Sequence, residues 1–146
     1  MEYRIVPMSL SHLDALVTIE KECFSNPWTR EGLEEEINNP LSHFLVAVTD
    51  SPVGYIGVQE ISSQAYVTNV AVLPAFRRQG IGKALVTAAI SGAKSRECEF
   101  ITLEVRQSNT VAISLYESLG FKTAGLRKGF YTNPSEDALI YTLSFE

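Results

Sequence analysis

Residues 70–85 combine features that suit them to binding a phosphate group. An apolar segment ends at a proline, and a basic, glycine-containing turn leads into a helical segment near Gly80. The first backbone N–H groups of a helix have no intrahelical acceptor and lie at the positive end of the helix dipole. Glycine lets the backbone approach an anion closely, and Arg77, Arg78 and Lys83 add positive charge. The segment therefore predicts a phosphate or pyrophosphate site.

Two common phosphate motifs do not fit this turn. The Walker pattern G-x-x-x-x-G-K-[ST], aligned on Gly82, needs a glycine where the chain has Arg77 and a hydroxyl where it has Ala84. The Rossmann pattern G-x-G-x-x-G, begun at Gly80, meets a leucine at its third glycine. The turn instead reads R-x-x-G-x-G. For so short a motif, a turn that merely joins a strand to a helix is the alternative interpretation.

Glu104 is the first candidate for proton transfer. It lies near the end of residues 100–105, an apolar segment typical of a central strand, on the face opposite to most of its apolar side chains. A glutamate at this place can act as a general base where the sheet opens. It can equally form a structural ion pair with Arg106 or Lys122, and the residues alone favour neither interpretation.

Tyr116 is the second candidate. Its helical spacing places it on one face with Ala112, Leu115 and Leu119. A tyrosine in a cleft can donate a proton to a leaving group. A core tyrosine whose hydroxyl finds a partner at the edge of the core is the commoner arrangement, and taken alone the residue favours it.

Composition limits the class of protein. The 146 residues predict one domain, 1–146, with a net charge of −5 that argues against a general nucleic-acid binder. No apolar run approaches the roughly 18 residues of a membrane span, and the first residues lack a signal peptide, so we expect a cytoplasmic protein. Cys23, Cys98, His12 and His43 show no ligand spacing, so we expect no metal and two buried cysteines.

The apolar patterns predict an α/β fold with a mixed sheet. The predicted strands are 4–6, 44–48, 53–61, 65–73, 100–105, 122–126 and 138–143. Helices are expected from Ser9 or Ser11, after Thr29, from Gly80, and from Asn109 to Gly120. Three consecutive strands form an antiparallel meander. The connection from 65–73 through the Gly80 helix to 100–105 is a parallel, right-handed crossover.

Three motifs in this order carry a resemblance to a known family. They are R-x-x-G-x-G at 77–82, L-E-V-R-x-S-N at 103–109 and A-x-x-L-Y-E-S-L-G-F at 112–121. The chain resembles the GNAT N-acetyltransferase superfamily, and more narrowly the bacterial ribosomal-protein-alanine N-acetyltransferases of the RimI type. F-S-N-P-W at 24–28 and N-V-A-V at 69–72 match as well. The family often has a tyrosine pair where this chain has Phe130 and Tyr131.

The resemblance implies a GNAT fold, a central mixed sheet of six to seven strands flanked by about four helices. Acetyl-CoA is the implied acetyl donor, with no metal. Backbone groups of Val70, Ala71 and Val72 would pair with its pantetheine arm, and Asn109 would contact the cofactor or order the site. The pyrophosphate would be held by Arg77, Arg78, Gln79, Gly80, Ile81, Gly82 and Lys83.

The resemblance also implies catalytic and acceptor residues. Glu104 would be the general base, acting through a water, and Tyr116 the general acid that protonates the departing CoA thiolate. Trp28, Tyr131 and the hairpin at 133–134 would border the acceptor. The implied partner is the N-terminus of a ribosomal protein, without nucleic acid or membrane, and the expected state is a monomer or weak dimer.

Amine chemistry favours an N-terminal acceptor. Only a deprotonated amine attacks a thioester, and an α-amino group has a pKa of about 7.7–8.0 against about 10.4 for lysine. The difference makes a lysine lone pair about 3.4 kcal/mol harder to expose at neutral pH. A lysine or small-molecule amine acetyltransferase on the same scaffold remains an alternative, and a non-catalytic acyl-CoA-binding module is a third.

Overall fold

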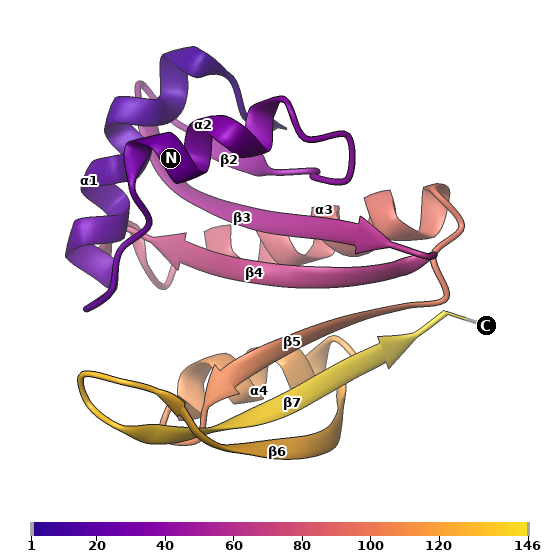
Figure 1. Cartoon of the computed structure of the whole chain (residues 1–146). Coiled ribbons are helices and arrows are strands. Elements are labelled where there is room, and N and C mark those ends of the chain that lie inside the picture. Colours follow the sequence, from indigo (N-terminus) through magenta and orange to yellow (C-terminus); the bar gives the residue numbers. More distant parts are fainter. Residues whose placement is uncertain (1, 146) are drawn as a thin grey trace.

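The computed structural model describes residues 2–145. A seven-stranded sheet with the order β1–β2–β3–β4–β5–β7–β6 forms its centre (Figure 1). The strands are β1 (Arg4–Pro7), β2 (Leu45–Val48), β3 (Pro52–Ile61), β4 (Gln64–Val72), β5 (Phe100–Arg106), β6 (Lys122–Tyr131) and β7 (Glu136–Ser144). The helices are α1 (Leu13–Cys23), α2 (Arg30–Ile37), α3 (Ile81–Ser95) and α4 (Thr110–Ser118). The predicted mixed sheet and its helices are confirmed.

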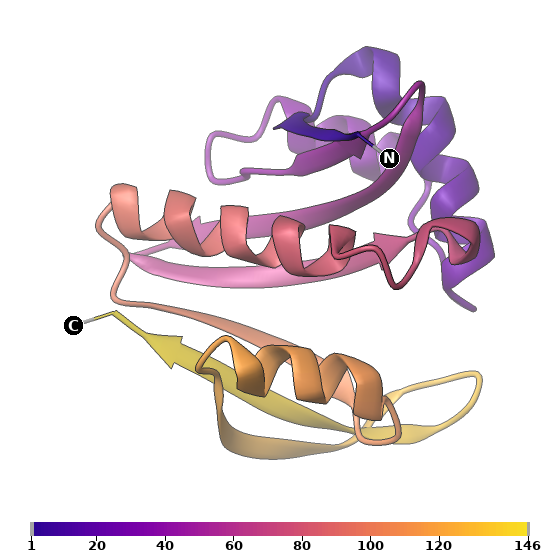
Figure 2. The ribbon, with the colours of Figure 1, turned by 180° about the vertical axis from the view of Figure 1, so that it is seen from behind.

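Helices cover both faces of the sheet. In Figure 1, α1 and α2 lie in front of the sheet and α3 and α4 behind it, and Figure 2 shows the latter pair from their own side. Leu13, Leu16 and Ile19 of α1 are fully buried against β2, β3 and β4. On the other face, Leu85 of α3 and Tyr116 of α4 belong to one core with the apolar side chains of β5.

One parallel pair divides the sheet into two antiparallel parts. Strands β1 to β4 pair antiparallel in sequence order. In the other part β7 pairs antiparallel with both β5 and β6 and lies between them. β4 and β5 pair parallel, as the predicted crossover requires, but only between Gln64–Tyr66 and Phe100–Thr102. A register shift between Gly57 and Val58 of β3 marks a bulge in β4 near Thr68. Beyond this point β4 and β5 separate toward their C-terminal ends (Figure 1).

Two element boundaries differ most from the prediction. Ser9 begins a 3₁₀ turn, Leu10–His12, and its N–H donates to His12 Nδ1 at 3.0 Å, so α1 starts later, at Leu13. β6 continues to Tyr131 because it stays paired with β7 through two register shifts. These shifts break the simple alternation of apolar residues. Within residues 2–145, no helix combines the length and the apolar character needed to cross a bilayer.

Candidate active site

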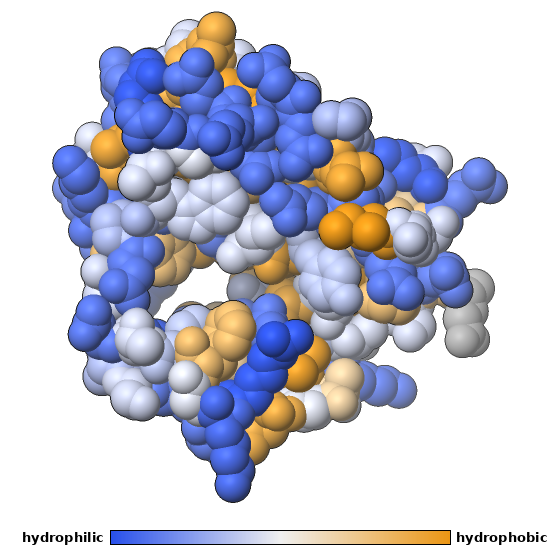
Figure 3. All heavy atoms as spheres, viewed as in Figure 1, coloured by the Kyte–Doolittle hydropathy of each residue, from blue (hydrophilic) through white to orange (hydrophobic). Residues whose placement is uncertain are grey.

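A cavity of about 360 Å³ opens where β4 and β5 separate. Its walls come from β4, β5, the connection between α1 and α2, and the start of α4. Figure 3 shows the molecule hollowed between the α1 side and the β6–β7 side. Six of the predicted site residues line this cavity: Trp28, Val70, Glu104, Asn109, Tyr116 and Tyr131.

The edge of β4 beside the cavity presents peptide groups that pair with no neighbouring strand, and of these Val72 O accepts from Arg77 Nε at 2.9 Å. Leu73 N–H donates to Val53 O at 2.8 Å, so in the same register Ala71 pairs with Tyr55 of β3. Peptide groups alternate in direction along an antiparallel pair, so those of Val70 and Val72 face away from β3. Of the three predicted backbone contacts, Val70 and Val72 are therefore presented to the gap, while Ala71 belongs to the β3 ladder.

The predicted phosphate loop lies at the outer end of this strand edge. Gly80 is the N-cap of α3 with a φ of 81°, which glycine adopts without strain. The first intrahelical bond runs from Ala84 N–H to Gly80 O, at 2.9 Å. Among residues 2–145 no acceptor binds the N–H groups of Ile81, Gly82 and Lys83. These donors fit a pyrophosphate group.

The surroundings of the loop support the same fit. A Cβ added at Gly80 would meet nothing within 4 Å, and one at Gly82 would lie 3.9 Å from Val72, so the backbone is open to an incoming group. Arg78, Gln79 and Lys83 are exposed. Arg77 instead turns toward the strand edge, where its Nε donates to Val72 O at 2.9 Å.

Glu104 lines the cavity and also forms an ion pair. Its Oε2 lies 3.0 Å from Arg127 Nε of β6, with 24% of the Glu104 side chain exposed. The expectation that a structural partner would be Arg106 or Lys122 is wrong, because Arg127 reaches Glu104 from β6 across the intervening strand β7. Arg127 binds Oε2, and within residues 2–145 no other group hydrogen-bonds to the carboxylate, so Oε1 is left to the cavity.

Tyr116 is buried, with its hydroxyl at the cavity. Its ring packs on Phe121 with centroids 5.7 Å apart. In the described chain the hydroxyl has no hydrogen-bond partner, which contradicts the expectation of a core tyrosine satisfied at an edge. Burial, and next the phenol of Tyr131, raise the pKa of Tyr116 to about 12. The hydroxyl therefore keeps its proton at neutral pH and can donate it.

Tyr131 closes the cavity from the β6 side. Burial, and next the charge of Glu104, raise the pKa of Tyr131 to about 12. The Arg106 guanidinium lies 4.5 Å from the centre of its ring. Phe130, at the position of the family's other tyrosine, is 45% exposed and packs edge-on against Tyr131 at 5.0 Å.

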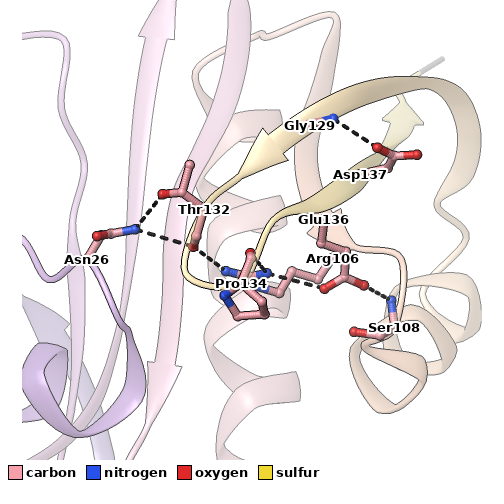
Figure 4. A network of polar contacts seen from close by, with 8 residues as sticks. All are labelled: Asn26, Arg106, Ser108, Gly129, Thr132, Pro134, Glu136 and Asp137. Carbon is pink, nitrogen blue, oxygen red and sulfur yellow. Dashed lines mark hydrogen bonds and ion pairs between the residues drawn. The ribbon is translucent and has the colours of Figure 1, made fainter.

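Hydrogen bonds bridge the two walls of the cavity at Asn26 (Figure 4). Asn26 Nδ2 donates to Thr132 Oγ1 at 3.0 Å, and Asn133 Nδ2 donates to Asn26 Oδ1 at 3.3 Å. The connection between α1 and α2 is thereby joined to the β6–β7 loop. The sequence indicated Asn26 only as part of the motif F-S-N-P-W at 24–28, because its hydrogen-bond partners lie more than 100 residues away.

Arg106 holds the same β6–β7 loop from below (Figure 4). Its guanidinium donates to Pro134 O at 3.0 Å and to Thr132 O at 3.1 Å, and it pairs with Glu136 at 3.2 Å. Glu136 also accepts from Ser108 N–H at 2.6 Å. The Ser108 side chain first, and then the Ser108 N–H and Arg106, lower the pKa of the Glu136 carboxyl group. Arg106 thus organises the β6–β7 side of the cavity, a role that its motif did not reveal.

Two residues of α1 complete the inner wall. Glu20 is only 1% exposed and accepts three hydrogen bonds, and nothing in the sequence pattern indicated it. Cys23 is half-buried and lines the cavity, which corrects the expectation of a core cysteine, whereas Cys98 is buried as predicted. Burial raises the pKa of the Cys23 thiol. Residues 2–145 contain no cluster of three or more His, Cys, Asp or Glu that could hold a metal.

Comparison with known proteins places this site in a family. The sequence model of the acetyltransferase (GNAT) family matches residues 13–121, which include the loop, Glu104 and Tyr116. The [ribosomal protein bS18]-alanine N-acetyltransferase of Escherichia coli K12 is 33% identical over 141 residues, 95% of either chain. A Bacillus subtilis relative with a provisional assignment to the same activity is 37% identical, covering 91% of this chain and 89% of its own.

The fold agrees with these sequence matches. The crystal structure of the ribosomal-protein-S18-alanine N-acetyltransferase from Escherichia coli superimposes with a TM-score of 0.90. It is 31% identical and covers 98% of this chain and 94% of its own. The chain therefore belongs to the acetyltransferase (GNAT) family and is an acetyl-CoA-dependent N-acetyltransferase.

Proposed function

We propose that the protein acetylates the α-amino group of an N-terminal alanine, that of ribosomal protein bS18, in the cytoplasm. The observation that carries the proposal is the cavity in which Glu104 and Tyr116 meet the unpaired edge of β4. Relatives above 30% identity over nearly the whole chain, named for this acceptor, support the choice of substrate.

The strand edge and the loop divide the binding of acetyl-CoA between them. The N–H groups at the start of α3, with Arg78 and Lys83, would hold the pyrophosphate. The peptide groups of Val70 and the N–H of Val72 would pair with the pantetheine arm as a further strand does, so the thioester end points into the cavity. Acetyl-CoA supplies an activated acetyl group, and the chain's own residues do the rest.

The chemistry is a direct transfer between two bound substrates. Glu104 accepts a proton from the acceptor ammonium through a water, so that the neutral nitrogen can attack the thioester carbon. The N–H of Val70 donates to the carbonyl oxygen as negative charge develops on it. As the C–N bond forms and the C–S bond breaks, the Tyr116 hydroxyl donates a hydrogen bond to the leaving sulfur, and the second proton released by the amine nitrogen ends on that sulfur. The products are the acetylated amine and the CoA thiol.

Two observations favour a chain end over a lysine side chain. The bridge from Asn26 to Thr132 and Asn133 joins the walls of the cavity, so an acceptor enters end-on beneath it. The lower pKa of an α-amine also suits a single carboxylate base. An acyl-cysteine route is disfavoured because burial raises the pKa of the Cys23 thiol and keeps it protonated.

Two matched peptides test the proposal. One begins with a free alanine and has no lysine, and the other is N-blocked with one lysine. Each is incubated with the protein and acetyl-CoA, and intact mass and thiol release are measured. One acetyl group on the alanine peptide with stoichiometric CoA release is the expected result. Modification of the lysine peptide alone would overturn the acceptor assignment, and CoA binding without transfer to either peptide would reject the proposed activity.

A further inference from the structure

Glu20 is a carboxylate enclosed in the inner wall of the cavity. It lies near the end of α1 and is 1% exposed. No Lys, Arg or His in the described chain forms an ion pair with it. Glutamate is almost never buried to this degree unless it is paired, because burial removes the hydration of its charge. The hydrogen-bond donors around this side chain therefore replace its hydration, and they indicate its role.

Three neutral donors from three different elements bind the Glu20 carboxylate. Oε1 accepts from the backbone N–H of Trp28 at 2.7 Å. Oε2 accepts from Tyr55 Oη of β3 at 2.5 Å and from Asn69 Nδ2 of β4 at 3.1 Å. Asn69 Nδ2 also contacts the Tyr55 hydroxyl, so the group is a closed network.

The network joins the two sides of the proposed reaction. The bond to Trp28 fixes the connection between α1 and α2 to the end of α1. In the same connection, Asn26 binds the β6–β7 loop. The bond to Asn69 fixes β4 next to its bulge, one residue before Val70 and its peptide groups facing the gap. One carboxylate thus contacts both the wall that borders the acceptor and the strand edge that would bind the acetyl donor.

Stability alone does not account for a glutamate at this position. The neighbouring α1 residues Leu16 and Ile19 are apolar and buried in the same cluster. Replacing buried charged groups by apolar side chains of similar volume is often neutral or stabilising. What an apolar side chain could not do is accept hydrogen bonds from the loop, β3 and β4 at once.

We propose that Glu20 is a positioning residue, which holds the acceptor wall at Trp28 in register with the β4 edge at Val70. The proposal rests on the proposed function, in which the acceptor amine and the thioester carbon meet between these two surfaces. A misplacement of about 1 Å between reacting groups can lower a rate on the order of 10²-fold. Glu20 acts here through its neighbours and does not touch the reacting atoms.

Two substitutions separate position from charge. Glu20→Gln keeps the length of the side chain but turns an NH₂ group toward one of the donors, and Glu20→Asp keeps the charge but withdraws it by one methylene. We expect both variants to lower kcat for the alanine peptide by about 10–100-fold while the KM for acetyl-CoA stays within about twofold. Glu22→Gln, on an exposed residue of the same helix, is the matched control and should retain wild-type kcat.

Trp28 supplies a readout that needs no substrate. It is the single tryptophan of the chain, and its ring packs on Phe44 with centroids 5.9 Å apart. Loss of the Glu20 bond should release the ring toward water and shift its emission to longer wavelength. In the wild-type protein, amide hydrogen exchange at Trp28 should be slower than at Ser25 and Asn26, which lie in the same connection without such a bond.

The outcomes are distinct. Folded Glu20→Gln with wild-type kcat and unshifted emission would overturn the proposal. Wild-type activity in Glu20→Asp together with a loss in Glu20→Gln would also overturn it, because charge and not position would then matter. If the variants do not fold, the wild-type protein still decides the question: fast amide exchange at Trp28 refutes the proposed bond between Glu20 and Trp28, and slow exchange supports it. Failure of the wild-type protein to modify any peptide would instead reject the proposed function.

Discussion

Replacing Tyr116 with phenylalanine removes one hydroxyl and leaves the surrounding packing unchanged. The ring is 7% exposed and packs on Phe121, and phenylalanine can keep that contact. The hydroxyl has no hydrogen-bond partner in residues 2–145, so no buried donor or acceptor loses its partner. We therefore expect the free energy of unfolding of Tyr116→Phe to lie within about 1 kcal/mol of wild type.

The pKa of Tyr116 determines how large the kinetic effect should be. At about 12, this pKa lies about 3.5 above the reference value of about 8.5 for a thiol, so complete proton transfer to a leaving thiolate is uphill. The hydroxyl then acts mainly by donating a hydrogen bond to the sulfur as charge develops. A hydrogen bond to a charged group contributes about 1.5–3 kcal/mol, which corresponds to a loss of about 10–150-fold in kcat.

Three measurements on Tyr116→Phe check this reasoning. Stopped-flow or thiol-release kinetics give kcat, calorimetry gives the Kd of acetyl-CoA, and urea unfolding gives stability. We expect kcat to fall, while the Kd of acetyl-CoA and the stability stay close to those of the wild-type protein. A loss near 10⁴-fold would show that full proton transfer occurs and that the phenol is more acidic in the complex. Unchanged kcat would remove Tyr116 from the chemistry, and lost acetyl-CoA binding would make it a structural residue.

Three further predictions follow from the same contacts. Glu104→Gln should lower kcat by about 10²–10⁴-fold without changing the Kd of acetyl-CoA, and full activity would exclude Glu104 as the base. Asn26→Ala removes the bridge between the cavity walls and should raise the activity on the N-blocked lysine peptide relative to the alanine peptide. An unchanged ratio would show that the bridge does not exclude lysine. Folding raises the pKa of Tyr116 from 10.0 to about 12, so the unfolded chain loses this proton first and stability falls as pH rises from about 10 through 12. At pH above 12 the loss from this group is about 3 kcal/mol, so urea midpoints should decline less in Tyr116→Phe than in wild type.

The sequence predicts best what depends on neighbours along the chain. Alternating and helical apolar patterns located all seven strands and four helices, and R-x-x-G-x-G located the turn before α3. The resemblance carried by L-E-V-R-x-S-N and A-x-x-L-Y-E-S-L-G-F indicated Glu104 and Tyr116 as a pair, and both line one cavity in the structure. The predicted start of the first helix was wrong because Ser9 caps a 3₁₀ turn instead, so α1 begins only at Leu13, after His12.

Long-range contacts were not predictable in this way. No pattern shows that β4 and β5 pair over only three residues each, yet this separation creates the cavity. The partner of Glu104 is Arg127, which stands two strands away in the sheet, and sequence proximity had suggested Arg106 or Lys122. The sequence did not distinguish Glu20 from the other polar residues of its helix, because two of its three partners lie 35 and 49 residues further along the chain.

The two halves of the site therefore differ in what a substitution can change. In the proposed site the acetyl-donor half consists mainly of backbone N–H groups at the start of α3 and along β4, so most side-chain substitutions other than those of Arg78 and Lys83 should leave it intact. The acceptor half depends on side-chain contacts between distant segments: Asn26 with Thr132, Arg106 with Glu136, and Glu20 with Trp28. Chains that share the glycine loop can thus use the same acetyl donor and differ in acceptor. It follows that the acceptor of a chain with this fold is better inferred from these contacts than from the loop.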